Sequence, residues 1–75
     1  MHVNAQQRVQ VLEILYNRLS KKPHSAWVSE REINKLGEVE FALVCLKELG
    51  QARKDGLNWH ITGPGILAYE AADEV

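Results

Sequence analysis

The chain has 75 residues, 45% of them hydrophobic and 25% charged, which fits one small globular domain spanning residues 1–75. Its single cysteine, Cys45, excludes an internal disulfide framework, and no apolar run reaches the roughly 18 residues of a membrane span. The opening residues MHVNAQQR lack the pattern of a signal peptide, so we expect a cytoplasmic protein.

Charge is distributed unevenly, although the formal net charge is only −1. Residues 1–37 contain six Lys or Arg and three acidic residues, a local charge of +3. Residues 38–75 contain three basic and seven acidic residues, a local charge of −4. The chain as a whole therefore has no general attraction to phosphate. Any attraction to nucleic acid has to come from the first half and from the bases near residues 53–54.

A helix is predicted over residues 4–20, with Asn4 as its N-cap. Lys21 and Lys22 place positive charge near the negative end of the helix, and Pro23 cannot continue it. Apolar residues recur at spacings of three and four and form a wide stripe, so we expect this helix to be covered on more than one side. The stripe consists of Val9, Val11, Leu12, Ile14, Leu15, Tyr16 and Leu19.

A second, short helix is predicted over residues 29–36. Ser29 and Glu32 have the spacing of a capping box, and Gly37 is a suitable residue just past a helix end. Residues 24–28 before it are too few for a helix and are expected to be extended. The apolar residues expected to pack here are Val28 and Ile33, at the two positions of a hydrophobic staple, and Leu36.

A third helix is predicted over residues 38–49, ending at Gly50. Its apolar face is expected to pack inward and consists of Val39, Ala42, Leu43, Leu46 and Leu49. Helical periodicity places Phe41 and Val44 on the solvent side, among charged residues. The charged residues of that side are Glu40, Lys47 and Glu48.

A β-hairpin follows, with Asp55-Gly56 predicted as its two-residue loop, which pairs Lys54 with Leu57. Side-chain alternation then gives the hairpin an inward and an outward face. The inward face consists of Ala52, Leu57, Trp59 and Ile61, and the outward face of Gln51, Arg53, Asn58 and His60.

A last helix is predicted over residues 64–73, because Thr62, Gly63 and Pro64 have the character of a helix start. Its buried residues are expected to be Ile66, Leu67 and either Tyr69 or Ala71.

This order of elements resembles the winged helix-turn-helix superfamily over nearly the whole chain. The segment SEREINKLGEVEFALVCLKELG looks like the second and third helices of such domains. The segment ARKDGLNWHITGPGILA looks like a wing followed by an x-L-T-x-x-G signature, here residues 60–65. The resemblance implies an α+β, mainly α fold with three helices, a two-stranded hairpin wing and a C-terminal helix.

The resemblance also implies a small DNA-binding protein, a transcriptional regulator, whose partner is double-stranded DNA. In DNA-binding members the third helix enters the major groove and the wing touches the backbone or the minor groove. The candidate DNA-binding residues of this chain are Arg31, Lys35, Lys47, Arg53, Lys54 and Asn58.

The third helix departs from that pattern, because base-reading faces favour Arg, Lys, Asn, Gln, Ser or Thr. Here the solvent side carries a single lysine, carboxylates and two apolar side chains. The alternative is a winged-helix module for protein–protein interaction or dimerisation that does not bind DNA. Its interface residues are Glu40, Phe41 and Val44.

No arrangement of residues indicates an enzyme, a cofactor or a metal. His2, His24 and His60 are scattered without metal-ligand spacing, and Cys45 has no partner cysteine. We interpret Cys45 as a small packed residue. Both tryptophans, Trp27 and Trp59, are interpreted as core residues; an exposed Trp27 would instead permit stacking on single-stranded nucleic acid.

Overall fold

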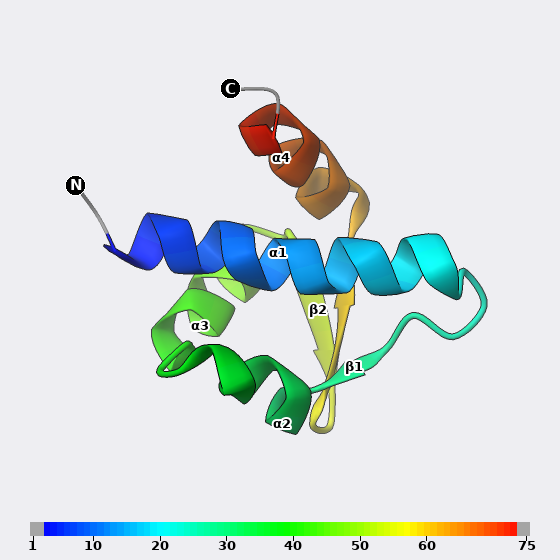
Figure 1. The fold of residues 1–75 in the computed structure, drawn as a ribbon, viewed down its shortest axis with the longest axis horizontal. Helices are drawn as coiled ribbons and strands as arrows, with labels where there is room; N and C mark the ends of the chain where they lie inside the picture. Colours follow the sequence, from blue (N-terminus) through cyan, green and yellow to red (C-terminus); the bar gives the residue numbers. More distant parts are fainter. Residues whose placement is uncertain (1–2, 74–75) are drawn as a thin grey trace.

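The computed structural model describes residues 3–73, which form an α+β, mainly helical fold with a three-stranded antiparallel sheet (Figure 1). The sheet has the strand order β1-β3-β2. The short extended stretch before the second helix thus adds a third strand to the predicted hairpin. In chain order the elements are α1 (Val3–Lys21), β1 (Val28–Ser29), α2 (Glu30–Ile33), the 3₁₀ helix η1 (Asn34–Leu36), α3 (Glu40–Glu48), β2 (Ala52–Asp55), β3 (Asn58–Ile61) and α4 (Gly63–Asp73).

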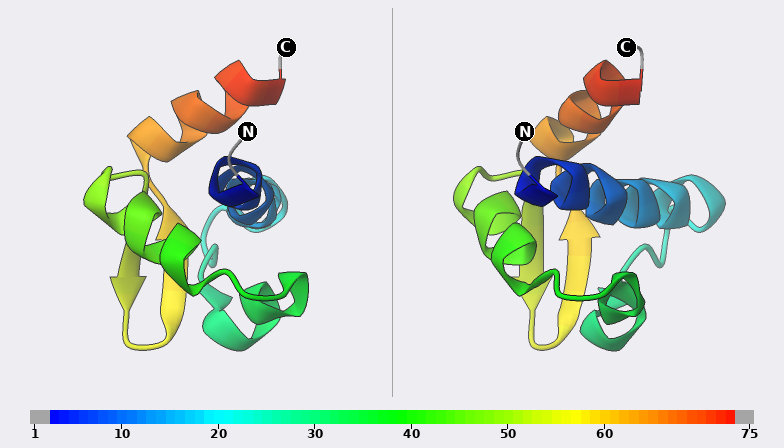
Figure 2. Two further views of the ribbon diagram at one scale, coloured as in Figure 1. Left: turned by 90° about the vertical axis from the view of Figure 1, so that its left-hand side faces the viewer. Right: turned by 60° about the vertical axis from the view of Figure 1, so that its left-hand side comes forward.

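Helices α1 and α3 pack against the sheet and against each other, and α4 crosses over α1 and packs against it (Figure 2). One hydrophobic core lies between these elements. Trp59 is only 3% exposed, which confirms its predicted core position. The buried cluster consists of Val11, Leu12, Leu15, Val28, Ile33, Val39, Ala42, Leu43, Leu46, Ala52, Trp59 and Ile61.

Helix α1 is slightly longer than predicted, so the expected N-cap, Asn4, lies inside its first turn. The Asn4 side-chain amide instead donates to Cys45 Sγ at 3.6 Å, across the contact with α3. The helix ends at Lys21, close to the predicted end. Val9 is 37% exposed, because the apolar stripe is wider than the face that α3, the sheet and α4 cover.

Helix α2 begins as predicted, because the Ser29 hydroxyl accepts a hydrogen bond from the Glu32 N–H at 3.3 Å. Ile33 is fully buried, but the inward placement of Leu36 was wrong, since Leu36 is 40% exposed. After Ile33 the chain tightens into η1, whose three residues per turn rotate Leu36 away from the face that an α-helix would give it.

Helix α3 begins at Glu40 and ends at Glu48, so it is shorter than the predicted 38–49. The inward placement of Leu49 was wrong: this residue follows the last helical turn and is 55% exposed. Its backbone N–H still bonds the Cys45 carbonyl at 2.9 Å, but the chain then turns towards β2 and carries the Leu49 side chain away from the core.

The hairpin turn begins one residue later than predicted, so each residue of β2 pairs with a residue two positions further along the chain than expected. Asp55 pairs with Asn58, so the loop is Gly56-Leu57 instead of Asp55-Gly56. Leu57 is therefore 67% exposed and was wrongly assigned to the inward face. Gly56 has φ +62°, whereas the described non-glycine residues all avoid positive φ. A turn with glycine first needs only one such residue, whereas an Asp-Gly loop of type I′ requires positive φ at Asp55 as well.

The start of α4 is held by a contact between residues 51 and 65. The Thr62 N–H donates to the Gln51 carbonyl at 3.1 Å, and the Thr62 hydroxyl caps α4 by accepting from the Gly65 N–H at 3.3 Å. A Cβ at Gly65 would stand 2.0 Å from the Gln51 carbonyl oxygen, so only glycine permits this approach. The threonine and glycine of the signature thus have structural roles.

Helix α4 is fixed to α1 through tyrosines and not through Leu67, whose predicted burial was wrong, since it is 69% exposed. The Tyr16 and Tyr69 ring centroids lie 4.7 Å apart. Each phenol hydroxyl also donates to a carboxylate on the opposite helix, Tyr16 to Glu70 at 2.7 Å and Tyr69 to Glu13 at 3.2 Å. Ala71, offered as the alternative to Tyr69, is exposed.

Candidate functional site

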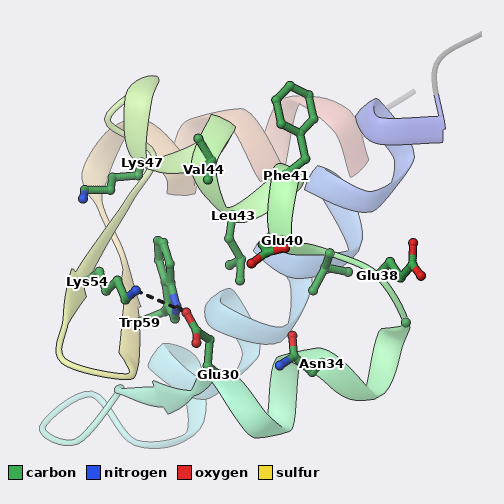
Figure 3. A pocket seen from close by; sticks show the side chains of 12 residues that line it. Glu30, Asn34, Glu38, Glu40, Phe41, Leu43, Val44, Lys47, Lys54 and Trp59 are labelled. Atoms are coloured by element: carbon green, nitrogen blue, oxygen red, sulfur yellow. Dashed lines mark hydrogen bonds and ion pairs between the residues drawn. The ribbon is translucent and has the colours of Figure 1, made fainter.

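An open groove of about 840 Å³ lies between α2 with η1, helix α3 and the hairpin (Figure 3). Its walls combine acidic, apolar and basic side chains. The groove is lined by Glu30, Asn34, Gly37, Glu38, Val39, Glu40, Phe41, Leu43, Val44, Lys47, Lys54 and Trp59.

Three groove residues from three elements are joined around one carboxylate. The Trp59 indole N–H donates to Glu30 Oε1 at 3.1 Å, and the Lys54 ammonium lies 3.4 Å from the same oxygen (Figure 3). The Lys54 ammonium also lies 5.6 Å from the Trp59 ring centroid. Trp59 and Lys54 are cross-strand partners, so the observed register brings these two side chains together.

The carboxylate is held there because α2 begins directly on the hairpin turn. The Glu30 N–H donates to the Leu57 carbonyl at 2.8 Å, and Ser29 pairs with Asn58 in the sheet. The first residue of α2 is therefore positioned by β1 on one side and by the turn on the other. One negative charge at this end of the groove is thereby already paired with Lys54.

The exposed side of α3 forms one wall of the groove. Phe41 is 67% exposed and Val44 is 50% exposed, which confirms their predicted solvent-side position. Glu40 and Lys47 are also exposed, and both line the groove. We refer to these four residues, Glu40, Phe41, Val44 and Lys47, as the α3 surface.

The structure distributes the six candidate DNA-binding residues over separate surfaces. Lys47 and Lys54 line the groove, but the Lys54 ammonium is paired with Glu30. Arg53, one residue along β2, points to the opposite face of the sheet, where its Cζ lies 5.5 Å from the Trp27 ring centroid. The remaining candidates are all exposed: Arg31 beside the turn, where it lines a second hollow with Leu57, Lys35 in η1, and Asn58 at the start of β3.

The outer sheet face carries a cluster that the sequence interpretation missed. Trp27 is 37% exposed, so its assignment to the core was wrong. Its ring lies at a centroid distance of 5.2 Å and an angle of 66° from that of His60, and Arg53 Cζ also lies 5.5 Å from the Trp27 ring centroid. Arg53 and His60 are cross-strand partners, so their side chains lie together on this face. The cluster could not be predicted without the third strand, β1, which pairs with β3.

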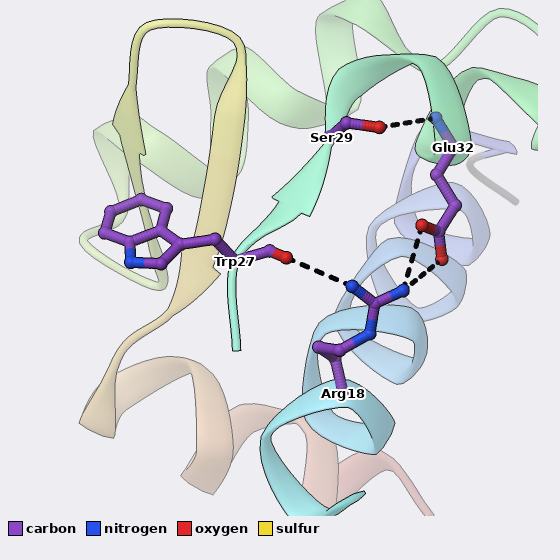
Figure 4. Close-up of polar contacts among 4 residues, drawn as sticks. All are labelled: Arg18, Trp27, Ser29 and Glu32. Carbon is purple, nitrogen blue, oxygen red and sulfur yellow. Dashed lines mark hydrogen bonds and ion pairs between the residues drawn. The ribbon is translucent and has the colours of Figure 1, made fainter. Parts of the chain in front are cut away.

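Part of the positive charge of the first half is used within the fold. The Arg18 guanidinium donates to both Glu32 oxygens, at 2.9 and 2.7 Å, and to the Trp27 carbonyl at 3.1 Å (Figure 4). Arg18 therefore joins the C-terminal half of α1 to α2 and to the segment before β1. The Glu32 carboxylate makes this contact instead of completing the predicted capping box.

No protein-family model, curated protein or solved structure matches this chain. In residues 3–73 no helix is long and apolar enough to cross a membrane. The same residues contain no group of three or more His, Cys, Asp or Glu side chains arranged around a metal ion.

Proposed function

We propose that this chain is a winged-helix module whose α3 surface binds a helix of another protein molecule instead of duplex DNA. The proposal rests on the side chains of the α3 surface. In a DNA-binding winged helix, this side of the third helix would face the duplex. Phe41 and Val44 form an exposed apolar centre there, 67% and 50% exposed, with charged side chains around it. An apolar centre with a charged rim is the usual composition of a protein interface.

The charges around the groove support a protein partner over phosphate. Glu30, Glu38 and Glu40 line it together with two lysines, and one of those, Lys54, is paired internally. Duplex binding depends on neutralising several phosphates with Lys and Arg, and each carboxylate at the surface opposes it. Lys47 is the remaining lysine of the groove, and one lysine can neutralise only a small part of the phosphates that duplex binding requires.

Duplex DNA binding is the second candidate, and one observation favours it. Lys47 of α3 and Lys54 of β2 both line the groove, on the two elements with which a winged helix would contact DNA. Rotation of Lys54 away from Glu30 would make two positive charges available on one side of α3.

The deciding experiment has two arms. In the first, ¹⁵N-labelled protein is titrated with a random-sequence duplex at low salt, and we expect the amide signals of α3 and the hairpin to stay in place. Shifts centred on Lys47 and Lys54 that disappear with added salt would overturn the proposal in favour of DNA.

In the second arm, the photo-crosslinking residue benzoylphenylalanine replaces Phe41. The matched control carries it at Leu67 of α4, which is 69% exposed and lies outside the groove. We expect a discrete cross-linked protein species from position 41 and none from position 67. Equal cross-linking from both positions, or none from either, would contradict the proposal.

A further inference from the structure

We infer that the partner of the α3 surface is a second copy of this chain, with the two α3 helices packed antiparallel about a two-fold axis. This inference rests on the proposed function and specifies its partner. A two-fold interface brings the same surface of both molecules together, so the surface has to be complementary to itself. The arrangement of charge along α3 meets that requirement.

Glu40 and Lys47 are seven residues apart in one helix. Seven residues are nearly two full turns, so the two side chains lie on the same flank, separated by about 10.5 Å along the axis. Both line the groove, which places them on the same side of α3. Phe41 and Val44 lie between them along the chain and are exposed. One helix therefore presents a negative charge, two apolar groups and a positive charge in that order.

An antiparallel copy reverses this order while keeping the flank. Glu40 then lies opposite Lys47 of the partner subunit, and Lys47 opposite Glu40 of the partner subunit. The apolar side chains of both helices meet near the axis. Antiparallel helix pairs place heptad-spaced flanking charges across the interface in this way.

The two charges are available for such a contact. The ion pairs formed within residues 3–73 are Arg18–Glu32 and Lys54–Glu30, so neither Glu40 nor Lys47 has a charged partner among the described residues. A parallel arrangement would place the Glu40 and Lys47 flanks of the two helices on opposite sides of the interface, so neither Glu40–Lys47 pair would form. The interface of a nine-residue helix is small, so we expect a weak, concentration-dependent dimer.

Charge reversal tests the antiparallel geometry directly by analytical ultracentrifugation. Glu40→Lys creates two Lys–Lys contacts across the axis, and Lys47→Glu creates two Glu–Glu contacts. Each single variant should weaken dimerisation about tenfold or more, because two pairs change from attraction to repulsion. An equimolar mixture of the two variants restores both attractive pairs and should form a heterodimer of wild-type affinity. The double variant in one chain should dimerise again as well.

Three further measurements separate a lost contact from a lost fold. Circular dichroism should show that each charge variant keeps its helical signal, and Phe41→Ser should weaken the dimer without any change of charge. Leu67→Ser, on the exposed side of α4, should leave the dimer unchanged. Wild-type protein that stays monomeric at millimolar concentration would overturn the inference. Single variants that dimerise normally, or a mixture that shows no preferential pairing, would do the same.

The result also separates this inference from the proposed function. A monomeric protein whose position 41 still cross-links to a different protein overturns only the second copy as partner. A monomeric protein with no such cross-link, whose α3 and hairpin signals shift with duplex DNA, overturns the proposed function itself.

Discussion

Gly65 lies against the backbone where the chain leaves α3 for β2, and a single methyl group there has no room. Its Cβ would stand 2.0 Å from the Gln51 carbonyl oxygen and 2.8 Å from Ile61 Cγ1. The oxygen belongs to the backbone and accepts the Thr62 N–H, so it cannot turn aside without loss of that hydrogen bond. The close approach therefore ties the start of α4 to the hairpin.

We predict that Gly65→Ala lowers the free energy of unfolding by about 1–3 kcal/mol, the usual cost of inserting a methylene where packing is tight. Gly63→Ala is the matched control, since a Cβ added there would meet no atom within 4 Å and its φ is not positive. This control should be neutral or slightly stabilising. Urea denaturation of both variants measures the difference, and equal stabilities would contradict the role of Gly65.

Glu30 holds together the contacts at the floor of the groove. Its carboxylate accepts the indole N–H of Trp59, a residue only 3% exposed, and pairs with Lys54. We predict that Glu30→Ala destabilises the protein by about 1–2 kcal/mol, because the buried indole N–H is left without its acceptor.

Glu30→Gln keeps an oxygen that can accept from the indole and removes only the charge. We expect it to lose less than half as much stability as Glu30→Ala in the same denaturation experiment. Equal losses in the two variants would show that the ion pair, and not the hydrogen bond, is the main contribution.

At the scale of the elements, local sequence signals predicted the centres of helices and strands better than their ends. Ser29, Ile33 and the α3 positions from Val39 to Leu46 occupy their expected places, since capping and helical periodicity are local properties. The errors at Leu36, Leu49 and Leu67 lie at a change of helix type, at a helix end and on an outer helix. Which side of those segments is covered depends on tertiary packing.

The hairpin turn offers a test at this scale, because the two registers place Leu57 in different surroundings. In the observed register Leu57 is 67% exposed in the loop, so Leu57→Ala should change the free energy of unfolding by no more than about 0.5 kcal/mol. With Asp55-Gly56 as the loop, Leu57 would be a core residue, and its truncation would cost about 2–5 kcal/mol. Thermal or urea denaturation distinguishes these outcomes, and a large loss would contradict the observed turn.

At the scale of the whole molecule, the net charge of each half of the chain did not predict which charged side chains are free to bind a partner. The first half carries +3, yet Arg18 is used inside the fold, and Arg53 and Lys54 of the hairpin face opposite sides of the sheet. The third strand and the turn register decide these directions, and neither follows from composition. The exposure of Phe41 and Val44, by contrast, was predicted from helical periodicity alone.

Dimerisation would also make the thermal stability of the protein depend on its concentration. Because a dimer stabilises the folded state by mass action, we predict that the melting temperature rises by roughly 5 °C for a hundredfold increase in protein concentration. Lys47→Glu should remove most of this dependence while leaving the melting temperature at low concentration nearly unchanged. A wild-type melting temperature that is independent of concentration would contradict dimerisation.

The two tryptophans have opposite surroundings, and this gives the molecule two separate optical reporters. Trp59, 3% exposed between the sheet and the groove, senses the core, whereas Trp27, 37% exposed on the outer sheet face, senses solvent beside His60 and Arg53. In Trp27→Phe protein the fluorescence follows unfolding of the core and events in the groove. In Trp59→Phe protein the emission reports on the outer face, so quenching by an added oligonucleotide or partner reveals which side of the sheet it touches.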